Sequence, residues 1–134
     1  MQHVQTRSTT SALVLTAVLI ALATLFTMYT KIPVPGIRGY FNVGDVVIMT
    51  SALLLGRKYG AYIGAIGPAL ADLFLGYAVF VPITFVVKGI EGYLVGTVYN
   101  NKTTTSALVA TIVGGIIIVA GYFIAEYFVF DPGV

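Results

Sequence analysis

Long apolar stretches, separated by short polar or turn-forming segments, make up almost the whole sequence. The clearest of them, Ser11 to Thr30, follows a polar leader and contains about 20 residues. At a rise of about 1.5 Å per residue, a helix of that length covers about 30 Å, the thickness of the hydrocarbon core of a bilayer. The pattern predicts five membrane-spanning helices in a single membrane domain over residues 1–134, at about 11–30, 43–58, 61–77, 81–99 and 106–130.

The second run is shorter than the others, and the segment before it has the composition of a loop. Lys31 to Asn42, "KIPVPGIRGYFN", carries two prolines and two glycines, which predicts a loop on one membrane surface. Val43 to Gly56 provides only about 14 residues, so it crosses the membrane only if the helix starts earlier or continues into the basic stretch Arg57 to Tyr59. A short or bent second span is therefore expected.

The composition is that of a membrane protein. Hydrophobic residues make up 58% of the chain and charged residues 9%, and the mean hydropathy is +0.98, whereas an average soluble domain is about 25% charged. Because hydrocarbon offers the backbone no hydrogen-bonding partner, apolar runs of this length predict helices, and the fold class is an all-α integral membrane protein, a compact helical bundle. Cysteine is absent, and no paired Ser and His, metal-ligand cluster or phosphate-binding loop occurs. No enzyme activity, cofactor or metal is therefore expected, and any ATP hydrolysis would take place on another chain.

Basic residues near the ends of the runs predict the orientation, because Lys and Arg are in excess on the cytoplasmic side of membrane proteins. With a cytoplasmic N-terminus, four basic residues lie inside and two outside. These are Arg7, Arg57, Lys58 and Lys102 against Lys31 and Arg38. The formal net charge of +2 follows from this distribution, so neither nucleic acid nor another acidic partner is expected.

Few ionisable side chains fall within the runs, where they are energetically expensive and usually face the interior of the bundle. Asp72, Lys88 and Glu91 lie inside predicted spans, whereas Asp45 and Glu126 lie near predicted outer helix ends. Asp72 and Lys88 reach similar depths on antiparallel neighbours and can pair, and Lys88 and Glu91, three residues apart, can pair as well. Two alternatives stay open: a neutralising cluster that fixes helix packing, and a polar floor beneath a solute pocket.

Asp45 is a separate case, because it stands at the start of a predicted helix in "FNVGDVV". A carboxylate in the first helical turn is favoured by the helix dipole and need not enter hydrocarbon. Asp45 therefore either contacts a solute at a pocket mouth or only caps the helix.

Small residues mark positions where helices approach closely in lipid. Pairs spaced four apart occur along the later runs, at Gly60 and Gly64, Gly92 and Gly96, and Ala110 and Gly114. A further pair in the first run, Ala17 and Ala21, is compatible with ordinary packing inside the bundle or with a docking face for another membrane protein.

Aromatic residues gather near the predicted outer helix ends. They form either the aromatic belt of a membrane interface or a stacking platform for a flat ring, with Asn42, Asp45 and Glu126 supplying hydrogen bonds. The aromatic residues concerned are Tyr40, Phe41, Tyr77, Phe80, Tyr122, Phe123, Tyr127 and Phe128.

Three motifs in order, "FNVGD", "GPALADLFLGY" and "KGIEG", resemble the substrate-binding S components of energy-coupling-factor (ECF) transporters, in the riboflavin-type branch. The resemblance extends from about Lys31 to Gly96. It implies a multi-pass protein of a prokaryotic plasma membrane that captures a vitamin or related micronutrient from outside. It also implies a transmembrane coupling subunit and two ATPase subunits as partners. Such S components usually have six helices, so a sixth span after "FDPGV" is expected to be missing from this chain.

The resemblance also implies functional roles for individual residues. The loop 31–42 becomes a candidate lid, and Ala17 and Ala21 become the candidate docking face for the coupling subunit. The implied substrate-binding candidates are Tyr40, Phe41, Asn42, Asp45, Asp72, Lys88, Glu91 and Glu126. The acids among them suit a cationic or hydrogen-bond-donating ring, whereas Lys88 and Arg38 are compatible with an anionic solute.

Two other functions are compatible with the same residues. A stand-alone secondary transporter, working as a small homo-oligomer, would use Asp72 and Lys88 as proton-coupling groups. A structural membrane scaffold would use these two residues only for assembly.

Overall fold

The chain forms five helices and one short β-hairpin within the residues that the computed structural model describes, which are 9–33, 35, 40–99 and 103–129. Three of the helices, α1, α4 and α5, are long and apolar enough to cross a membrane, which confirms the predicted all-α membrane fold. In chain order the elements are α1 (Thr9–Tyr29), β1 (Lys31–Pro33), β2 (Tyr40–Asn42), α2 (Gly44–Leu55), α3 (Arg57–Leu75), α4 (Phe80–Val98) and α5 (Thr104–Val129).

The orientation of the bundle stays a prediction. It rests partly on residues that lie outside the described part of the chain, namely Arg7, Arg38 and Lys102. The segment "FDPGV", after which a sixth span was expected to be missing, also lies outside it.

The ends of the predicted loop 31–42 pair with each other as a two-stranded antiparallel sheet. Lys31 lies opposite Asn42, Ile32 opposite Phe41 and Pro33 opposite Tyr40. Isoleucine and the aromatic residues favour strands. The pairing places Asn42 beside the end of α1, where the Thr27 hydroxyl donates a hydrogen bond to the Asn42 side-chain oxygen at 3.2 Å.

The second helix is shorter than the predicted span of 43–58. It ends at Leu55, and Arg57 already belongs to α3. Gly56 between them has φ +98°, a conformation that residues with a side chain rarely adopt, so the helix stops there. The 12 residues of α2 cover only about 18 Å, less than the hydrocarbon core. The basic stretch is therefore the first turn of α3 and not an extension of α2.

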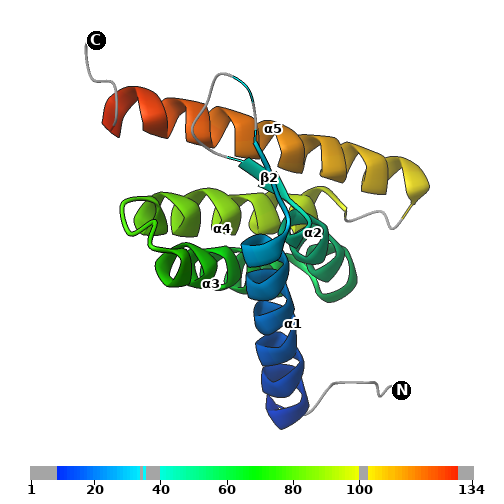
Figure 1. Cartoon of the computed structure of the whole chain (residues 1–134). Coiled ribbons are helices and arrows are strands. Elements are labelled where there is room, and N and C mark those ends of the chain that lie inside the picture. Colours follow the sequence, from blue (N-terminus) through cyan, green and yellow to red (C-terminus); the bar gives the residue numbers. More distant parts are fainter. Residues whose placement is uncertain (1–8, 34, 36–39, 100–102, 130–134) are drawn as a thin grey trace, which may run out of the picture.

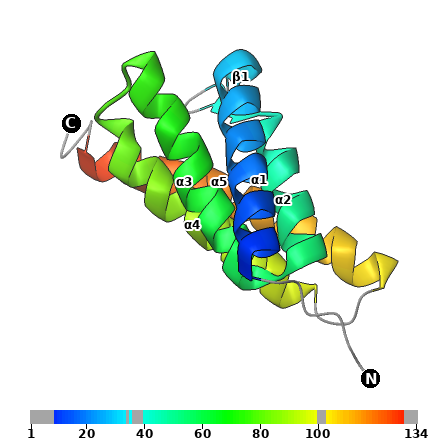
Figure 2. The same ribbon diagram turned by 90° about the horizontal axis from the view of Figure 1, so that it is seen from below.

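The helix α3 lies at the centre of the arrangement, in contact with α1, α2 and α4, and α5 packs on α4. In Figure 1, α5 forms the upper layer, α4 and α3 lie below it, and α1 descends from the middle. Figure 2 shows α1, α2 and α3 side by side. Buried apolar residues join these elements: Ala23, Ile48 and Ile63 connect α1, α2 and α3, and other clusters connect α4 with α2 and α5.

Glycines bring α3 and α4 into backbone contact, as the small-residue pattern predicts. A side chain at Gly92 would meet the backbone of Gly60, and one at Gly64 would meet the carbonyl of Lys88. At the end of the crossing, Gly96 faces the backbone of Arg57. This contact fixes the position of α4, which carries most of the buried polar side chains described next.

Candidate functional site

Lys88 is the centre of a buried polar group in an otherwise apolar bundle. Its side chain extends from the middle of α4, and the residue is only 1% exposed. The ammonium forms an ion pair with Asp45 in the first turn of α2, and lies 3.8 Å from a carboxylate oxygen of Glu91, one turn further along α4. Two helices therefore supply the Asp45–Lys88–Glu91 cluster, and the predicted pairing of Lys88 with Glu91 is confirmed.

Asp45 lies deeper than its place at a helix start suggested. It is 6% exposed, and the described start of α2 makes no side-chain cap hydrogen bond. The interior position is possible because Gly44 lets α2 begin close to α1; a side chain there would collide with Thr27 and Asn42. The main contact of Asp45 is thus Lys88, although its negative charge in the first turn still agrees with the helix dipole.

Asp72 belongs to a second group of polar side chains. The Thr84 hydroxyl donates a hydrogen bond to the Asp72 carboxylate at 2.5 Å, and Thr84 and the Tyr122 hydroxyl are 2.8 Å apart. Thr84 lies one helical turn before Lys88 on α4, and the Lys88 ammonium reaches Asp45 at the start of α2. Asp45, which was not part of the predicted cluster of Asp72, Lys88 and Glu91, therefore joins Lys88 and Glu91.

Sequence reasoning missed Thr84. It lies four residues before Lys88, and residues at that spacing share one face of a helix. Thr84, Lys88 and Glu91 are all buried on α4, so the spacing was a usable signal.

The Asp45–Lys88–Glu91 cluster has more acceptors than donors. Asp45 Oδ2 and both carboxylate oxygens of Glu91 are buried and have no hydrogen-bond partner among the described residues. Glu91 is 0% exposed and lies against α5, with its Cγ close to the space beside Gly114. Two carboxylates face one ammonium, so the cluster carries an excess negative charge when all three groups are ionised. Buried acceptors of this kind are rare, because each loses its hydration without replacement.

The remaining predicted site residues belong to β2 and α5. Asn42 is buried at the end of β2 and accepts the bond from Thr27. Glu126 is half-buried on α5, one turn after Tyr122. Tyr40 and Phe41 belong to β2, and their side chains lie outside what the structure describes.

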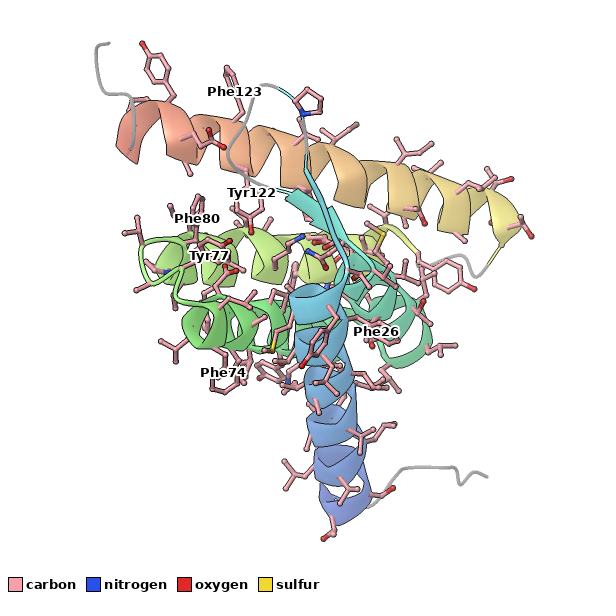
Figure 3. All side chains as sticks on the ribbon, viewed as in Figure 1. Phe26, Phe74, Tyr77, Phe80, Tyr122 and Phe123 are labelled. Atoms are coloured by element: carbon pink, nitrogen blue, oxygen red, sulfur yellow. The ribbon has the colours of Figure 1, made fainter. Side chains whose placement is uncertain are left out.

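The aromatic residues predicted near the outer helix ends divide into two groups. Tyr77, Phe80 and Tyr122 are in contact, with ring centroids 6.3 Å and 6.5 Å apart in successive pairs. Figure 3 shows Tyr122 directed from α5 toward α4, whereas Phe123 points the opposite way. The Lys88 ammonium lies 5.8 Å from the centroid of the Tyr122 ring. The outward-facing group, Phe123 with Tyr127 and Phe128, is exposed, as an interfacial belt requires.

Comparison with known families identifies the class of this membrane protein. The family model described as ECF-type riboflavin transporter, S component, matches residues 7–133. The chain belongs to this S-component family. A Pyrococcus woesei protein, called the uncharacterized protein in gap 3′ region, is 42% identical over 113 residues, which are 82% of this chain and 74% of the relative. The thiamine precursor transporter HmpT of Lactococcus lactis subsp. cremoris is 32% identical over 107 residues, which are 79% of this chain and 62% of the relative.

The family match covers more of this S component than the motifs from Lys31 to Gly96 do. It assigns the protein to a family of membrane proteins for vitamin transport, a role that is not enzymatic. The aligned region spans less than two thirds of the length of HmpT.

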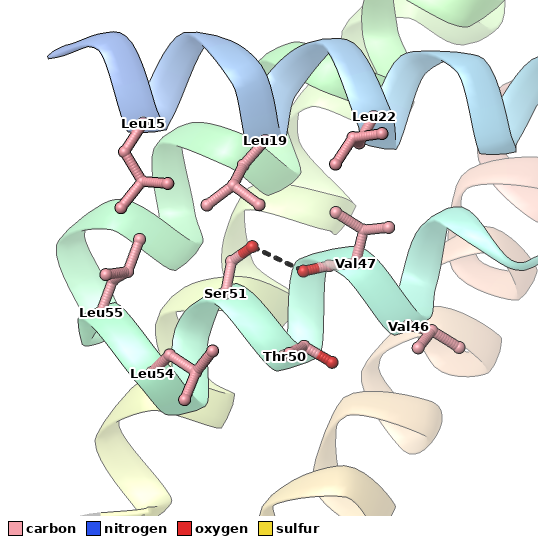
Figure 4. Close-up of a pocket in the computed structure, with 9 residues that line it drawn as sticks. All are labelled: Leu15, Leu19, Leu22, Val46, Val47, Thr50, Ser51, Leu54 and Leu55. Atoms are coloured by element: carbon pink, nitrogen blue, oxygen red, sulfur yellow. Dashed lines mark hydrogen bonds between the residues drawn. The ribbon is translucent and has the colours of Figure 1, made fainter. Parts of the chain in front are cut away.

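The first helix of this S component presents its predicted docking residues on the surface. Ala17 and Ala21 are both exposed, whereas Ala23 is buried and packs on Gly67 of α3. On a different face of α1, which carries Leu15, Leu19 and Leu22, an apolar groove of about 440 Å³ runs between α1 and α2 (Figure 4). Within that groove the Ser51 hydroxyl donates to the Val47 carbonyl of its own helix at 2.7 Å. A role of Ala17 and Ala21 in docking stays a prediction.

Proposed function

We propose that this S component captures a vitamin-like micronutrient at the outer face of a prokaryotic cell membrane and delivers it through an ATPase-driven ECF complex. A transmembrane coupling subunit and two ATPase subunits would be its partners. Membership of the family supports this proposal. The Asp45–Lys88–Glu91 cluster is the observation that supports a binding site in this part of the bundle, because ionised groups at this depth are costly and mark functional positions in membrane proteins.

The excess of acceptors favours a substrate that donates hydrogen bonds or carries a positive charge. Lys88 bonds to one oxygen of Asp45 and lies 3.8 Å from Glu91, too far for a hydrogen bond, so Glu91 and the second oxygen of Asp45 can accept hydrogen bonds from a ligand. An anionic solute would instead face two carboxylates across the cluster, which is unfavourable at short range. Thr84 and Tyr122 add neutral hydrogen-bonding groups one turn away, and the Tyr77, Phe80 and Tyr122 rings offer aromatic faces.

The names of the relatives suggest which compounds to test first. HmpT is named a thiamine precursor transporter, and the family is named for riboflavin. A pyrimidine that carries an amino group provides the N–H donors that Glu91 lacks. We therefore propose an amino-substituted thiamine precursor ahead of riboflavin as the substrate.

A Glu91→Gln variant is expected to bind such a precursor about 10- to 100-fold more weakly, because a hydrogen bond to a charged acceptor contributes about 1.5–3 kcal/mol. Binding is measured by thermal shift and calorimetry on protein purified in detergent. For the wild type, a ligand at about 100 times its dissociation constant adds about 2.7 kcal/mol of stability. Thr111→Val is the control, because this exposed hydroxyl donates to the Ala107 carbonyl of its own helix.

Two results would contradict the proposal. Equal affinity of the wild type and Glu91→Gln would show that Glu91 does not contact the substrate. Failure of every thiamine precursor and of riboflavin to stabilise the wild type would show that the proposed substrate class is wrong. Uptake into liposomes that runs on a proton gradient without any ATPase would instead support a stand-alone secondary transporter.

Docking through α1 makes a separate prediction. Replacing Ala17 and Ala21 with Trp is expected to abolish co-purification with the coupling subunit, because two indoles prevent close approach of another helix. Substrate binding should persist, since both residues are exposed and distant in sequence from the polar cluster. Ile116→Trp, at an exposed position on α5, is the matched control. An unchanged yield of the complex with the double Trp variant would refute this interface.

A further inference from the structure

A second apolar groove lies on the outside of the bundle, between α3 and α4, and has a volume of about 430 Å³. It exists because the two helices touch through Gly60 and Gly92, while the neighbouring residues on the outer side are also small. Ala61, Ala65 and Gly89 form its floor, and Val86, Ile90 and Tyr93 form its exposed wall. The groove is separate from the polar cluster, because Gly89, Ile90 and Tyr93 lie on the opposite face of α4 from Lys88 and Glu91.

Two cations stand at one end of this groove. The Arg57 guanidinium lies 5.4 Å from the centroid of the Tyr93 ring, which itself lines the groove. Lys58 follows directly, and both residues are exposed. No acidic residue occurs in the first turn of α3. The groove is therefore apolar along its length and positively charged at its end.

We propose that this groove binds an anionic phospholipid, with one acyl chain along the floor and the phosphate against Arg57 and Lys58. An occupant must combine a long apolar part with an anionic head, and a bilayer supplies such molecules at every exposed helix surface. With the predicted cytoplasmic N-terminus, the two cations face the leaflet in which anionic lipids attract basic residues, with about 1 kcal/mol for each Lys or Arg.

A second copy of this chain fits the groove less well. Complementing Arg57 and Lys58 would require an exposed acid, but Asp45, Asp72 and Glu91 are buried. Glu126 lies at the opposite end of the bundle, near the start of α4, because Tyr122 contacts Phe80. Among the described residues, charge complementarity therefore favours a lipid over a second copy of this chain.

The test uses the whole chain in nanodiscs of neutral phosphatidylcholine and anionic phosphatidylglycerol with identical acyl chains. Native mass spectrometry counts the lipids that stay bound after release from the nanodisc. The wild type should retain phosphatidylglycerol in preference to phosphatidylcholine. In Arg57→Ala and Arg57→Ala/Lys58→Ala, that preference should fall about fivefold for each cation removed.

A variant that fills the groove tests whether an acyl chain binds there. Val86→Trp should lower retention of both lipids, because the indole covers the floor without entering the contact between α3 and α4. Val119→Trp is the matched control: it occupies a comparable apolar surface on α5, a helix whose sequence contains no Lys or Arg. It should leave retention and headgroup preference unchanged.

Each other outcome overturns the proposal. If the double alanine variant still prefers phosphatidylglycerol, Arg57 and Lys58 do not bind the headgroup. Unchanged lipid retention in Val86→Trp would show that the acyl chain does not lie in the groove. Displacement of the bound lipid by glycerol 3-phosphate would identify a site for free phosphate. A concentration-dependent dimer that Val86→Trp disrupts would show that a second copy occupies the surface.

Discussion

A Lys88→Met variant is expected to lose about 3–5 kcal/mol of stability, because removal of one partner leaves a buried charge uncompensated. Asp45 and Glu91 would then be two carboxylates in an apolar interior, with three or more oxygens lacking a donor. Methionine fills nearly the same volume as the lysine stem, so the loss reports on charge and not on a cavity. The free energy of unfolding in mixed micelles measures the effect.

Two control variants separate the ion pair from general damage to α4. Lys58→Met removes an exposed lysine and should change stability by no more than about 0.5 kcal/mol. The triple variant Lys88→Met/Asp45→Asn/Glu91→Gln removes all three charges, and should recover most of the loss, because a buried ion pair is often replaced by neutral groups at little cost. A triple variant no more stable than Lys88→Met would mean that the uncompensated charge is not the cause.

Contacts within one helix could be predicted from sequence, and contacts between helices only in part. The spacing of Lys88 and Glu91 is enough to place both on one face of α4, and the same rule would have included Thr84. The Asp45–Lys88 pair joins residues 43 positions apart, so it depends on where α2 lies in the bundle. Nothing in the local pattern around Asp45 distinguishes a residue at a pocket mouth from one bonded to α4.

The boundary between α2 and α3 escaped prediction for a local reason. One glycine with positive φ, Gly56, ends a helix inside a stretch that would otherwise continue into Arg57. A glycine within an apolar run is compatible with either outcome, because it also occurs at helix contacts in membranes.

Small residues on α1 show why packing partners decide which side of a helix is buried. Ala17, Ala21 and Ala23 are chemically identical, and the spacing of the first two was compatible with packing inside the bundle or with docking of another membrane protein. Ala23 is the buried one, because Gly67 on α3 leaves room for it. The predicted close approach at the glycines of α3 and α4 is confirmed, and both helices carry the small-residue pattern.

The α3–α4 contact gives the second large effect. Gly92→Leu is expected to destabilise the protein by about 3 kcal/mol or more, at the upper end of overpacking costs. A Cβ at this position would overlap the backbone carbonyl of Gly60, and a backbone group cannot move aside as a flexible side chain can. Gly92→Ala should also lose stability, although alanine has a better helix propensity than glycine by about 1 kcal/mol. The unfolding assay used for Lys88→Met measures both variants.

Gly115 provides a matched control, because it is a helical glycine of α5 with nothing within 4 Å of the place where a Cβ would lie. Gly115→Ala should therefore leave stability unchanged or raise it by up to about 1 kcal/mol through helix propensity alone. Opposite signs for the same substitution at Gly92 and Gly115 would isolate the backbone contact as the cause, and equal effects would contradict it. Because the contact also holds Lys88 opposite Gly64, Gly92→Ala should weaken substrate binding as well, whereas Gly115→Ala should not.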